Sequence, residues 1–542
     1  MADTSMRTEA NSPVVLDKTA EADFVVVGGG LAGVCAAIAA ARRGASVILV
    51  QNRPVLGGNC SSEMRVGILG AHGDENKEAG LLEELQLRNF RFNPLLRYTL
   101  WDDVLLSAVV GEPKITLLLN TSVTGVDMDG NRISAVKGWN GNAYTRWTLR
   151  GRHFADCSGD GILRLSGADF AREPQLAGDG RARFCYSRPF PDDNNFWWID
   201  FGGNLDTVGD ANAIQFELKR IAYGAWAYMK NHPDGRARGY DLDWIGAIPC
   251  KRESARFVGP RILTQRDVIS GGHFEDVVAY GGWSLDDLDP DAFWRRGHHS
   301  IQHAAPSPFG IPFDCLYSVN VPNLMFAGRD ISCTHMGLSA ARVMGTCAAL
   351  GQAVGTAAAF LVKYGIDPAQ LRRERIAELQ DALEDDDCML PFRWRKVSPL
   401  TREAKCAEGV EVLKSGIDRG YGGADNGLWL APGDESAVYE WDAPRRLSGA
   451  RIVFDSQMTV RGKRMRKLEA TTERTQMPAM LARSFRIDVR SGGVWRTVFA
   501  DDENILRLRK AAFGPVDADA LRLVVTDTWG GGKAHLFALD AF

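Results

Sequence analysis

Residues 24–33 read FVVVGGGLAG, a short β-branched run that passes directly into a glycine-rich turn. Such a run is typical of a buried parallel strand. An alanine-rich segment follows at residues 34–43 and ends at Gly44, a residue type that commonly stops a helix. Residues 46–50 form a second apolar run. The order strand, turn, helix, strand within about 30 residues predicts one βαβ unit.

The turn has the spacing Gly28-x-Gly30-x-x-Gly33, the dinucleotide-binding fingerprint when it joins a strand to a helix. Gly28 permits the tight turn, Gly30 lets a pyrophosphate approach, and Gly33 lets helix and strand pack closely. The helix N-terminus attracts the phosphate charge. The fingerprint expects a ribose-binding acid about 20 residues further on. This chain has the uncharged Gln51 there, and Arg53 taken alone could indicate the 2′-phosphate of NADP.

The 542 residues have a globular composition, with 45% hydrophobic and 24% charged residues. Lysine and arginine number 64 against 68 acids, a net charge of −4, so the basic excess of a nucleic-acid-binding protein is missing. The ten cysteines are scattered without a C-x-x-C pair, which favours free thiols and a cytoplasmic location.

Two segments bear on membrane attachment. Residues 1–20 have no apolar core, so we expect a disordered lead-in, neither a signal peptide nor an anchor. The apolar stretch 340–362 contains Arg342 and many alanines and glycines, which favours a buried helix over a membrane span.

The sequence pattern changes several times along the rest of the chain. Short strand-like runs over residues 115–149, with a turn at 129–131, predict a small antiparallel insert before the chain returns to the parallel sheet at 154–155. The chain re-enters the sheet at 323–327 and continues into a long helix from Gly337. Residues 367–386 are typical of a charged amphipathic helix.

The predicted fold class is α/β, with an all-β domain at the C-terminal end. We expect a discontinuous Rossmann-like domain over residues 21–180 and 320–392 and a mixed α/β substrate module over 181–319. Residues 395–542 show short alternating strands separated by turns, which predicts a β-sandwich.

Four further motifs follow the first turn: GGNCSSE at 57–63, RESAR at 252–256, GRDISCTH at 328–335 and RVMGTCAALGQA at 342–353. In this order they resemble a family of FAD-dependent oxidoreductases. That family is marked by GGN-(T/C)-S-S-E, R-E-S-x-R, G-R-x-I-S-x-T-H and R-V-M-x-T-C-A-x-x-G-Q-A. The resemblance covers residues 24–390 and implies a Rossmann-like FAD-binding domain, FAD as the cofactor and an oxidoreductase activity.

The resemblance also implies cofactor contacts. The turn at Gly57 and Gly58 passes the flavin diphosphate, residues 154–161 form a second flavin-contacting turn, and Asp330 meets the ribityl chain. A helix that begins at Gly337 points at the flavin ring and stabilises negative charge on it. The expected cofactor-binding residues are Gly28, Gly30, Leu31, Ala32, Gly33, Gln51, Asn52, Arg53, Gly57, Gly58, Asn59, Ser61, Val123, Ser158, Gly159, Gly328, Asp330, Gly337, Leu338 and Ser339.

Flavin chemistry requires the protein to orient the substrate and to move protons, and histidine is the natural base near neutral pH. We expect His335 to be this base, with a purely structural histidine as the alternative. His72 is a second candidate for the same cavity. Arg252, Glu253 and Arg256 form a charge cluster on the substrate side, suited to gripping a carboxylate or polar oxygens; a structural ion-pair network is the alternative.

Other chemistry-bearing residues have simpler interpretations. Cys60 and Cys333 are expected to pack rather than to attach to the flavin. Histidines 298, 299 and 303 have poor ligand spacing and no acid, so no metal site is expected. Aromatic residues 196–198 are expected in the core, with stacking on a sugar as the alternative. The C-terminal domain is similar to galactose-binding modules on carbohydrate enzymes, and its candidate platform residues are Trp429, Trp441, Trp495 and Trp529.

The leading hypothesis is an FAD-dependent dehydrogenase or oxidase that converts a secondary hydroxyl of a sugar, glycoside or related polyol to a ketone. A hydride passes to the flavin and His335 takes the hydroxyl proton. The alternatives are a reductase of an unsaturated carboxylic acid, an RNA-modifying or non-catalytic flavin-binding protein, and a sugar-binding protein with a vestigial site. The expected partners are a small-molecule substrate and an electron acceptor, whether oxygen, a quinone or a carrier. Oligomeric state stays open.

Overall fold

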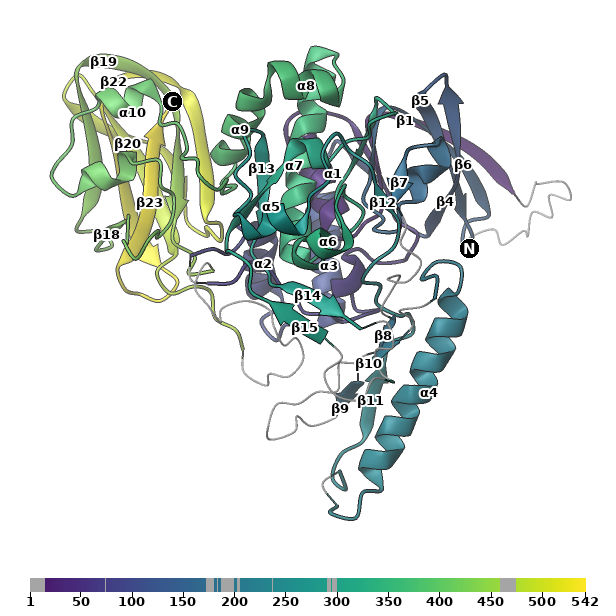
Figure 1. Cartoon of the computed structure of the whole chain (residues 1–542). Helices are drawn as coiled ribbons and strands as arrows, with labels where there is room; N and C mark the ends of the chain where they lie inside the picture. Colours follow the sequence, from purple (N-terminus) through teal and green to yellow (C-terminus); the bar gives the residue numbers. More distant parts are fainter. Residues whose placement is uncertain are drawn as a thin grey trace, which may run out of the picture.

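The computed structural model describes residues 15–73, 75–171, 180–182, 184–186, 199–201, 205–235, 237–289, 294, 300–458 and 474–542. Figure 1 shows an α/β body, an all-β C-terminal domain beside it, and helix α4 (Ala211–Lys230) projecting away from both. The α/β body is Rossmann-like and the C-terminal domain is all-β, which confirms the predicted fold class.

A parallel sheet forms the centre of the α/β body. Its strand order is β3-β2-β1-β6, and β17 also pairs with β6. The strands are β1 (Leu16–Val27), β2 (Val47–Val50), β3 (Ile115–Leu118), β6 (Thr145–Asp156) and β17 (Leu324–Phe326). Val27 is opposite Val50 on one side and Asp156 on the other, so three strands end together beside the glycine turn. The carboxyl ends of parallel strands are where this class of fold binds its ligand.

The N-terminal strand is longer than the sequence predicted. We expected a lead-in up to residue 20, but β1 begins at Leu16 because residues 16–22 pair with residues 145–151 of β6. This extension is polar, and an exposed ion pair joins Arg146 to Asp17 at 2.8 Å. Hydrogen bonding between strands, and not burial of apolar side chains, forms this part of the strand.

The antiparallel segment is also shorter than expected. It comprises β4 (Thr121–Asp129), β5 (Arg132–Asn140) and the first part of β6. The run that starts at Ile115 is β3, a parallel neighbour of β2 and no part of the insert. The runs expected at 144–149 and 154–155 belong to β6, which pairs with β5 at one end and with β17 at the other.

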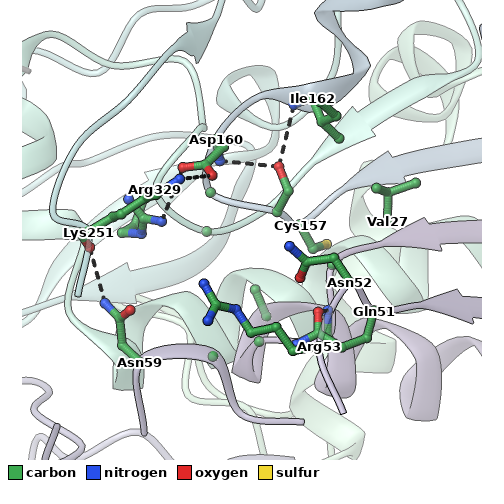
Figure 2. A pocket seen from close by; sticks show the side chains of 18 of the residues that line it. Val27, Gln51, Asn52, Arg53, Asn59, Cys157, Asp160, Ile162, Lys251 and Arg329 are labelled. Atoms are coloured by element: carbon green, nitrogen blue, oxygen red, sulfur yellow. Dashed lines mark hydrogen bonds and ion pairs between the residues drawn. The ribbon is translucent and has the colours of Figure 1, made fainter. Parts of the chain in front are cut away.

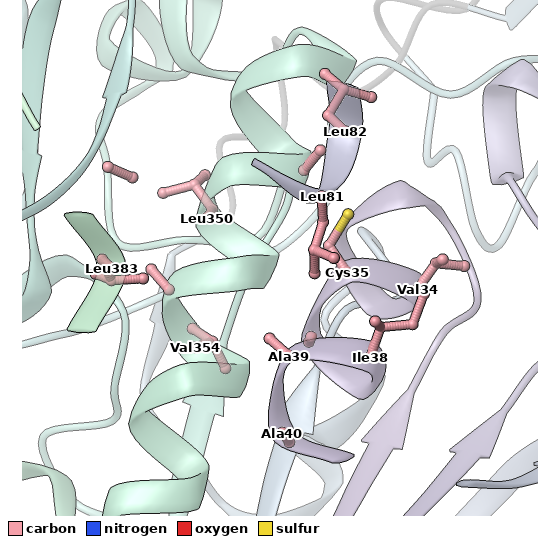
Figure 3. Packing of buried hydrophobic residues seen from close by; sticks show 14 of the residues in the cluster. Val34, Cys35, Ile38, Ala39, Ala40, Leu81, Leu82, Leu350, Val354 and Leu383 are labelled. Carbon is pink, nitrogen blue, oxygen red and sulfur yellow. The ribbon is translucent and has the colours of Figure 1, made fainter. Parts of the chain in front are cut away.

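Two helices pack face to face against the sheet (Figure 3), α1 (Leu31–Arg42) and α7 (Met344–Tyr364). A Cβ at Gly351 would lie 2.0 Å from the Ala32 carbonyl oxygen, and one at Gly355 would lie 2.1 Å from that of Ala36. The two backbones are therefore in direct contact. Within the described residues, α7 is the one helix long and apolar enough to cross a membrane, but most of it is buried inside the protein.

The helix expected from Gly337 is in fact two. The first is α6 (His335–Ala341), which begins at His335 because the Thr334 hydroxyl caps it by accepting a hydrogen bond from the Gly337 amide at 3.1 Å. It ends at Arg342, and α7 starts after Val343, whose backbone is extended. The charged segment 367–386 likewise divides at Arg375 into α8 (Pro368–Glu374) and α9 (Ile376–Asp385).

The α/β body has further elements outside the central sheet. Its other helices are α2 (Leu81–Phe92), α3 (Tyr98–Val110) and α5 (Gln265–Ile269), whereas α10 (Pro399–Glu403) lies in the all-β domain (Figure 1). The strands are β7 (Phe170–Ala171), β8 (Gly180–Ala182), β9 (Phe184–Tyr186), β10 (Ile199–Phe201), β11 (Leu242–Ile245), β12 (Arg256–Phe257), β13 (Val277–Gly281), β14 (Leu285–Leu288), β15 (Ser300–His303) and β16 (Phe309–Pro312). These strands form two-stranded pairs: β10-β8, β11-β9, β12-β7, β13-β16 and β14-β15.

The C-terminal domain has six antiparallel strands in the order β18-β23-β19-β22-β20-β21. They are β18 (Leu428–Leu430), β19 (Ser436–Phe454), β20 (Ala482–Ser491), β21 (Val494–Asp501), β22 (Leu508–Thr528) and β23 (Ala534–Ala541). Register breaks interrupt the long pair β19 and β22. Such breaks bend strands, and the sheet curls around an apolar core in the sandwich arrangement that the sequence predicted.

Buried arginines fasten this domain to the α/β body. Arg395 donates to Asp540 at 2.5 Å and to Asp418 at 3.0 Å. Arg507 of the all-β domain binds Asp387, just after α9, at 2.8 Å, and it also lies 3.8 Å from Glu83 of α2. Removing one partner of such a buried pair leaves an uncompensated charge and costs roughly 3–5 kcal/mol. The two parts therefore form one unit.

The buried His153 of β6 predicts a pH dependence of stability. Burial lowers the pKa of His153 to about 4. Between that pKa and the usual value of about 6.5, the unfolded chain binds a proton that the folded chain does not, so stability falls as pH falls. We expect His153 to account for about 2 kcal/mol of the loss in unfolding free energy between pH 7 and pH 5. Urea unfolding at both pH values measures it.

The variant His153→Asn should lose that share of the pH dependence. The matched control is His303→Asn, because His303 is exposed on β15 and should leave the pH dependence as in the wild type. An unchanged pH slope in His153→Asn would contradict the assignment.

Candidate functional site

A cavity of about 360 Å³ opens where β1, β2 and β6 end beside the N-terminus of α1 (Figure 2). Fourteen of the expected cofactor-binding residues line it: Gly28, Gly30, Leu31, Ala32, Gln51, Asn52, Arg53, Gly57, Gly58, Asn59, Val123, Ser158, Gly159 and Gly328. Figure 2 shows Arg53, Gln51 and Asn52 on one side, and Lys251, Asn59 and Arg329 on the other. Polar side chains therefore line the cavity on both of these sides.

The glycine turn has the shape that a dinucleotide requires. A Cβ at Gly33 would lie 1.8 Å from the Gly28 carbonyl oxygen, so the helix sits directly against the turn. A Cβ at Gly30 would meet nothing within 4 Å, because that side faces open space. Gly30 is also the N-cap of α1, and no side chain caps the first turn of this helix. The turn therefore leaves a cradle for a diphosphate at a helix N-terminus.

The amide of Gln51 is used to hold backbone. Its Oε1 accepts a hydrogen bond from the Gly29 amide at 2.9 Å, and its Nε2 donates to the Val55 carbonyl at 3.0 Å. Gln51 therefore joins the glycine turn to the loop after β2. Its contact with a ribose stays a prediction.

A pair of buried carboxyl groups lies next to residues of the cavity lining: Asp156 ends β6, and Asp330 follows β17. Asp156 accepts hydrogen bonds from the Ser158 amide at 2.9 Å and the Leu163 amide at 2.7 Å. Asp330 accepts one from the Gly159 amide at 3.1 Å, while its buried Oδ1 has no hydrogen-bond partner among the described residues. Burial and the charge of Asp156 raise the pKa of Asp330 well above its usual range. A hydroxyl of the cofactor would satisfy the open oxygen of Asp330.

The charged groups that line the cavity are mostly cationic. They are Arg53, Asp160, Arg164, Lys251, Arg329 and Arg342. Lys251 binds Asp160 at 2.5 Å, and Asn59 donates to the Lys251 carbonyl at 3.1 Å. Both contacts join the segment before the RESAR motif to the FAD-type turns. An excess of cations suits a ligand that carries a diphosphate.

His335 and the predicted charge cluster of Arg252, Glu253 and Arg256 lie outside the cavity lining. His335 Nδ1 lies 2.8 Å from Glu253 Oε2, and Nε2 lies 3.4 Å from Asp287 Oδ1. Glu253 is buried and also pairs with Arg256, whose Nε donates to the Cys333 carbonyl at 2.9 Å. The structure thus brings together three of the predicted residues, in a chain that ends at the partly exposed Asp287.

Arg342 connects this cluster to the cavity. It lines the cavity, and its Nη2 donates to Asp286 Oδ2 at 2.6 Å. Arg252 donates to the backbone carbonyl of Asp286. Asp286 and Asp287 are neighbours on β14. The same strand therefore carries both carboxylates, that of Asp286 bound to Arg342 and that of Asp287 next to His335. The sequence hypothesis missed both aspartates and the roles of Arg342 and Lys251, although the motif RVMGTCAALGQA already contained Arg342.

The protonation of His335 is set by opposing effects. Burial, the largest of these, lowers its pKa, whereas the hydrogen bond and the charge of Glu253, together with the hydrogen bond to Asp287, raise it. The pKa of His335 is therefore raised above its usual value. Glu253 orders the ring through Nδ1, and the longer contact at Nε2 leaves that nitrogen as the exchangeable position.

Several predicted residues lie away from the cavity lining. Ser61, Gly337, Leu338 and Ser339 are buried behind it, and Gly33 packs against the turn. His72 is exposed and stacks on Trp283 with ring centroids 4.3 Å apart. Burial raises the pKa of Cys60 to about 12, and it also raises that of Cys333, as expected for packing thiols.

Some expectations fall on other parts of the chain. Residues 196–198 and His298 and His299 lie outside the described residues. Among the described residues no group of three or more candidate metal ligands occurs. In the C-terminal domain the indole of Trp441 donates to the Leu400 carbonyl at 2.9 Å and that of Trp529 to the Asn504 carbonyl at 2.8 Å. Trp495 is half-buried, and Trp429 is exposed.

A Rossmann-like sheet with an open glycine turn and a cationic cavity defines a dinucleotide-binding protein. The chain belongs to the FAD dependent oxidoreductase family, whose model matches residues 23–175 and 171–383. It is an FAD-dependent oxidoreductase, and the cradle at Gly30 and the open oxygen of Asp330 fit that cofactor. No curated protein matches the chain.

The solved structures include distant similarities. A geranylgeranyl bacteriochlorophyll reductase-like protein from Thermoplasma acidophilum is 13% identical over 68% of this chain and 85% of that chain, with a TM-score of 0.33. The flavin-dependent brominase Bmp2 is 14% identical over 68% and 86%, with a TM-score of 0.36. A chitosan-binding module from a Paenibacillus sp. IK-5 chitosanase/glucanase is 14% identical over 26% and 92%, with a TM-score of 0.18. At these TM-scores the similarities carry no argument about function.

Because one side of Gly30 faces open space, a larger side chain at this position should weaken FAD binding without unfolding the protein. The backbone of Gly30 is extended, with φ −66° and ψ 178°, so valine fits it, but its side chain would project into the cradle. We expect Gly30→Val to bind FAD roughly 10- to 100-fold more weakly, as overpacking of a fitted site does. Quenching of flavin fluorescence during titration with FAD measures the affinity.

Gly224→Val is the matched control, because a Cβ on Gly224 of α4 also meets nothing within 4 Å but lies far from the cavity lining. This control should retain wild-type affinity for FAD. Equal affinity in Gly30→Val and the wild type would show that the diphosphate does not lie in this cradle.

Proposed function

We propose that this FAD-dependent oxidoreductase oxidises a secondary hydroxyl of a sugar, glycoside or related polyol to a ketone. The observation that carries the proposal is the ring of His335 held between a buried carboxylate and a partly exposed one, Glu253 and Asp287. A histidine in this setting can take a proton from the substrate and pass it to water. Bound FAD supplies the acceptor for the hydride that leaves the carbinol carbon.

The protein supplies the proton chemistry. The hydroxyl proton moves to Nε2 of His335 as the C–H hydride leaves, so the alcohol becomes a ketone and one proton remains on the ring. Glu253 stabilises the imidazolium through Nδ1–H, as the carboxylate of a catalytic dyad does. Asp287 then receives the proton from Nε2 and releases it to solvent. Arg342, bound to Asp286, orients polar substrate oxygens at the cavity.

The first experiment adds a panel of sugars, glycosides and polyols to the flavin-loaded enzyme without oxygen. Bleaching of the flavin bands by at least one compound is expected. In His335→Gln the bleaching rate should fall roughly 10²- to 10⁴-fold, the usual contribution of a general base. If no polyol bleaches the flavin, or if His335→Gln bleaches as fast as the wild type, the proposal is wrong.

The pH dependence of bleaching tests the pairing with Glu253. His335 accepts a proton only when neutral, so the rate should fall as pH falls through its raised pKa. Glu253→Gln removes the charge that raises this pKa, and the midpoint of the pH profile should move to lower pH. Glu378→Gln is the control, because it also removes one carboxylate charge, but Glu378 lies on α9 and pairs with Arg375 at 2.7 Å. If the midpoint of the pH profile does not move in Glu253→Gln, His335 is not the base that accepts the proton.

A second candidate is the reduction of an unsaturated carboxylic acid. The cationic lining of the cavity, with Arg342 and Lys251, favours a carboxylate-bearing ligand. This reaction requires the reverse experiment, in which the chemically reduced enzyme is mixed with unsaturated acids without oxygen. Reoxidation by such an acid, together with no bleaching by any polyol, would select this candidate.

A further inference from the structure

Three exposed aromatic side chains lie in residues 394–429, the stretch that leads from the α/β body into the all-β domain. Trp394, just before the all-β domain, is 45% exposed, Tyr421 is 49% exposed and Trp429 is 41% exposed. We call these three residues the aromatic row. Tyr421 lies on the loop that leads into β18, and Trp429 lies in β18 itself. Aromatic side chains of this size usually bury 150–250 Å² each, so three exposed ones within one stretch of 36 residues, two of them in contact, point to a ligand surface.

The first pair of rings is held in place. Trp394 and Tyr421 meet edge to face, with centroids 4.7 Å apart and planes at 82°. The backbone beneath them is fixed, because the buried Arg419 donates to the carbonyls of Glu75 and Lys77, both at 3.0 Å. The rings therefore present their faces without the entropy loss that a flexible loop would have on binding.

Trp429 is held from behind. Its ring stacks on that of the buried His535, with centroids 4.3 Å apart and planes at 13°. Its indole nitrogen donates to Asp425 Oδ2 at 3.0 Å, and Asp425 Oδ1 lies 2.8 Å from His535 Nε2. Asp455 holds the other nitrogen of His535 at 2.9 Å. One face of the Trp429 indole is therefore covered by His535, and the carboxylate of Asp425 lies at the edge of the indole.

A series of packing contacts lies between the loop that carries Tyr421 and the strand next to the cavity. A Cβ at Gly420 would lie 2.8 Å from the side chain of Glu75, so the loop packs against the segment that contains His72. His72 stacks on Trp283, and Ser307 donates to the His72 carbonyl at 2.7 Å. Trp283 immediately precedes β14, whose Asp286 binds the cavity residue Arg342.

We propose that the aromatic row binds a glycan chain, so that the substrate is the end of an oligosaccharide or polysaccharide rather than a free monosaccharide. A pyranose ring offers a flat C–H face for an aromatic ring and hydroxyl groups at its edge for carboxylate oxygens. Trp429 with Asp425 presents that combination. A nucleic acid is disfavoured by the net charge of −4 and by the acid at the edge. The identity of the oxidised substrate rests on the proposed function, whereas glycan binding by the row does not.

The test measures binding without any oxidation. The full-length protein runs on native gels that contain a soluble polysaccharide: hydroxyethyl cellulose, xylan, galactomannan, polygalacturonate or alginate. We expect at least one of these gels to retard the wild type. Replacement of Trp394, Tyr421 and Trp429 by alanine should abolish the retardation, and each single replacement should weaken binding about fivefold, since one aromatic contact contributes that much.

Two controls separate binding from folding. Phe216→Ala removes an aromatic ring that is 72% exposed on α4, outside the row, and should be retarded like the wild type. Tyr421→Phe keeps the ring and should also bind. Thermal unfolding of the alanine variants checks that the domain is intact.

The opposite results are equally definite. No retardation by any of the five polysaccharides, or equal retardation of the wild type and the triple variant, overturns the proposal. Self-association that depends on concentration in sedimentation and is lost in the triple variant would assign the row to a second copy of the chain instead. If a polyol bleaches the flavin while no gel retards the protein, the proposed oxidation is supported and glycan binding by the aromatic row is wrong. If a gel retards the protein while no polyol bleaches the flavin, glycan binding is supported and the proposed oxidation is wrong.

Discussion

Direct contact between backbones governs this structure. At Gly33 the first turn of α1 lies against the Gly28 carbonyl, and at Gly351 and Gly355 helix α7 lies against the carbonyls of α1. A side chain at any of these positions would separate the layers by ångströms. Because α1 is held from both sides, its uncapped N-terminus stays at the ends of the parallel strands, where a diphosphate gains from the helix dipole. The same contact fixes the N-terminal end of α7, which carries the cavity residues Met344 and Cys347. The cofactor site is thus a consequence of close helix packing.

Much of this arrangement could be predicted from local sequence patterns. The βαβ unit follows from one apolar run, three glycines and an alanine-rich helix, and the all-β domain follows from alternation between turns. What escaped prediction depends on distant partners. Residues 16–22 are polar, and they form a strand only because β6 offers hydrogen-bonding groups. Asp287 has no local signal either, since β14 brings it to His335 from 48 positions away in the chain. The amide of Gln51 looked like a weakened ribose contact, yet it is bonded to backbone at both ends.

The charged groups around His335 form pairs that differ in their exposure to solvent. The pair of Glu253 and Arg256 is fully buried, where ions are held in one state by their partners. Asp287 is open to water and can exchange protons. His335 lies between these two environments, and in the oxidation that we propose the proton would pass from this ring toward solvent. Arg342 and Asp286 form a second buried pair, which joins this cluster to the cavity.

The buried arginines between the two parts of the molecule also bear on how the chain is made. Glu83 of α2 is inside the protein, and its partner Ser456 lies 373 positions later in the chain. The cation next to it, Arg507, follows later still. Domains generally fold from the N-terminal side during synthesis, but this carboxylate is without its partners until most of the chain has left the ribosome. The final packing around Glu83 of α2 therefore forms only after the all-β domain has been synthesised.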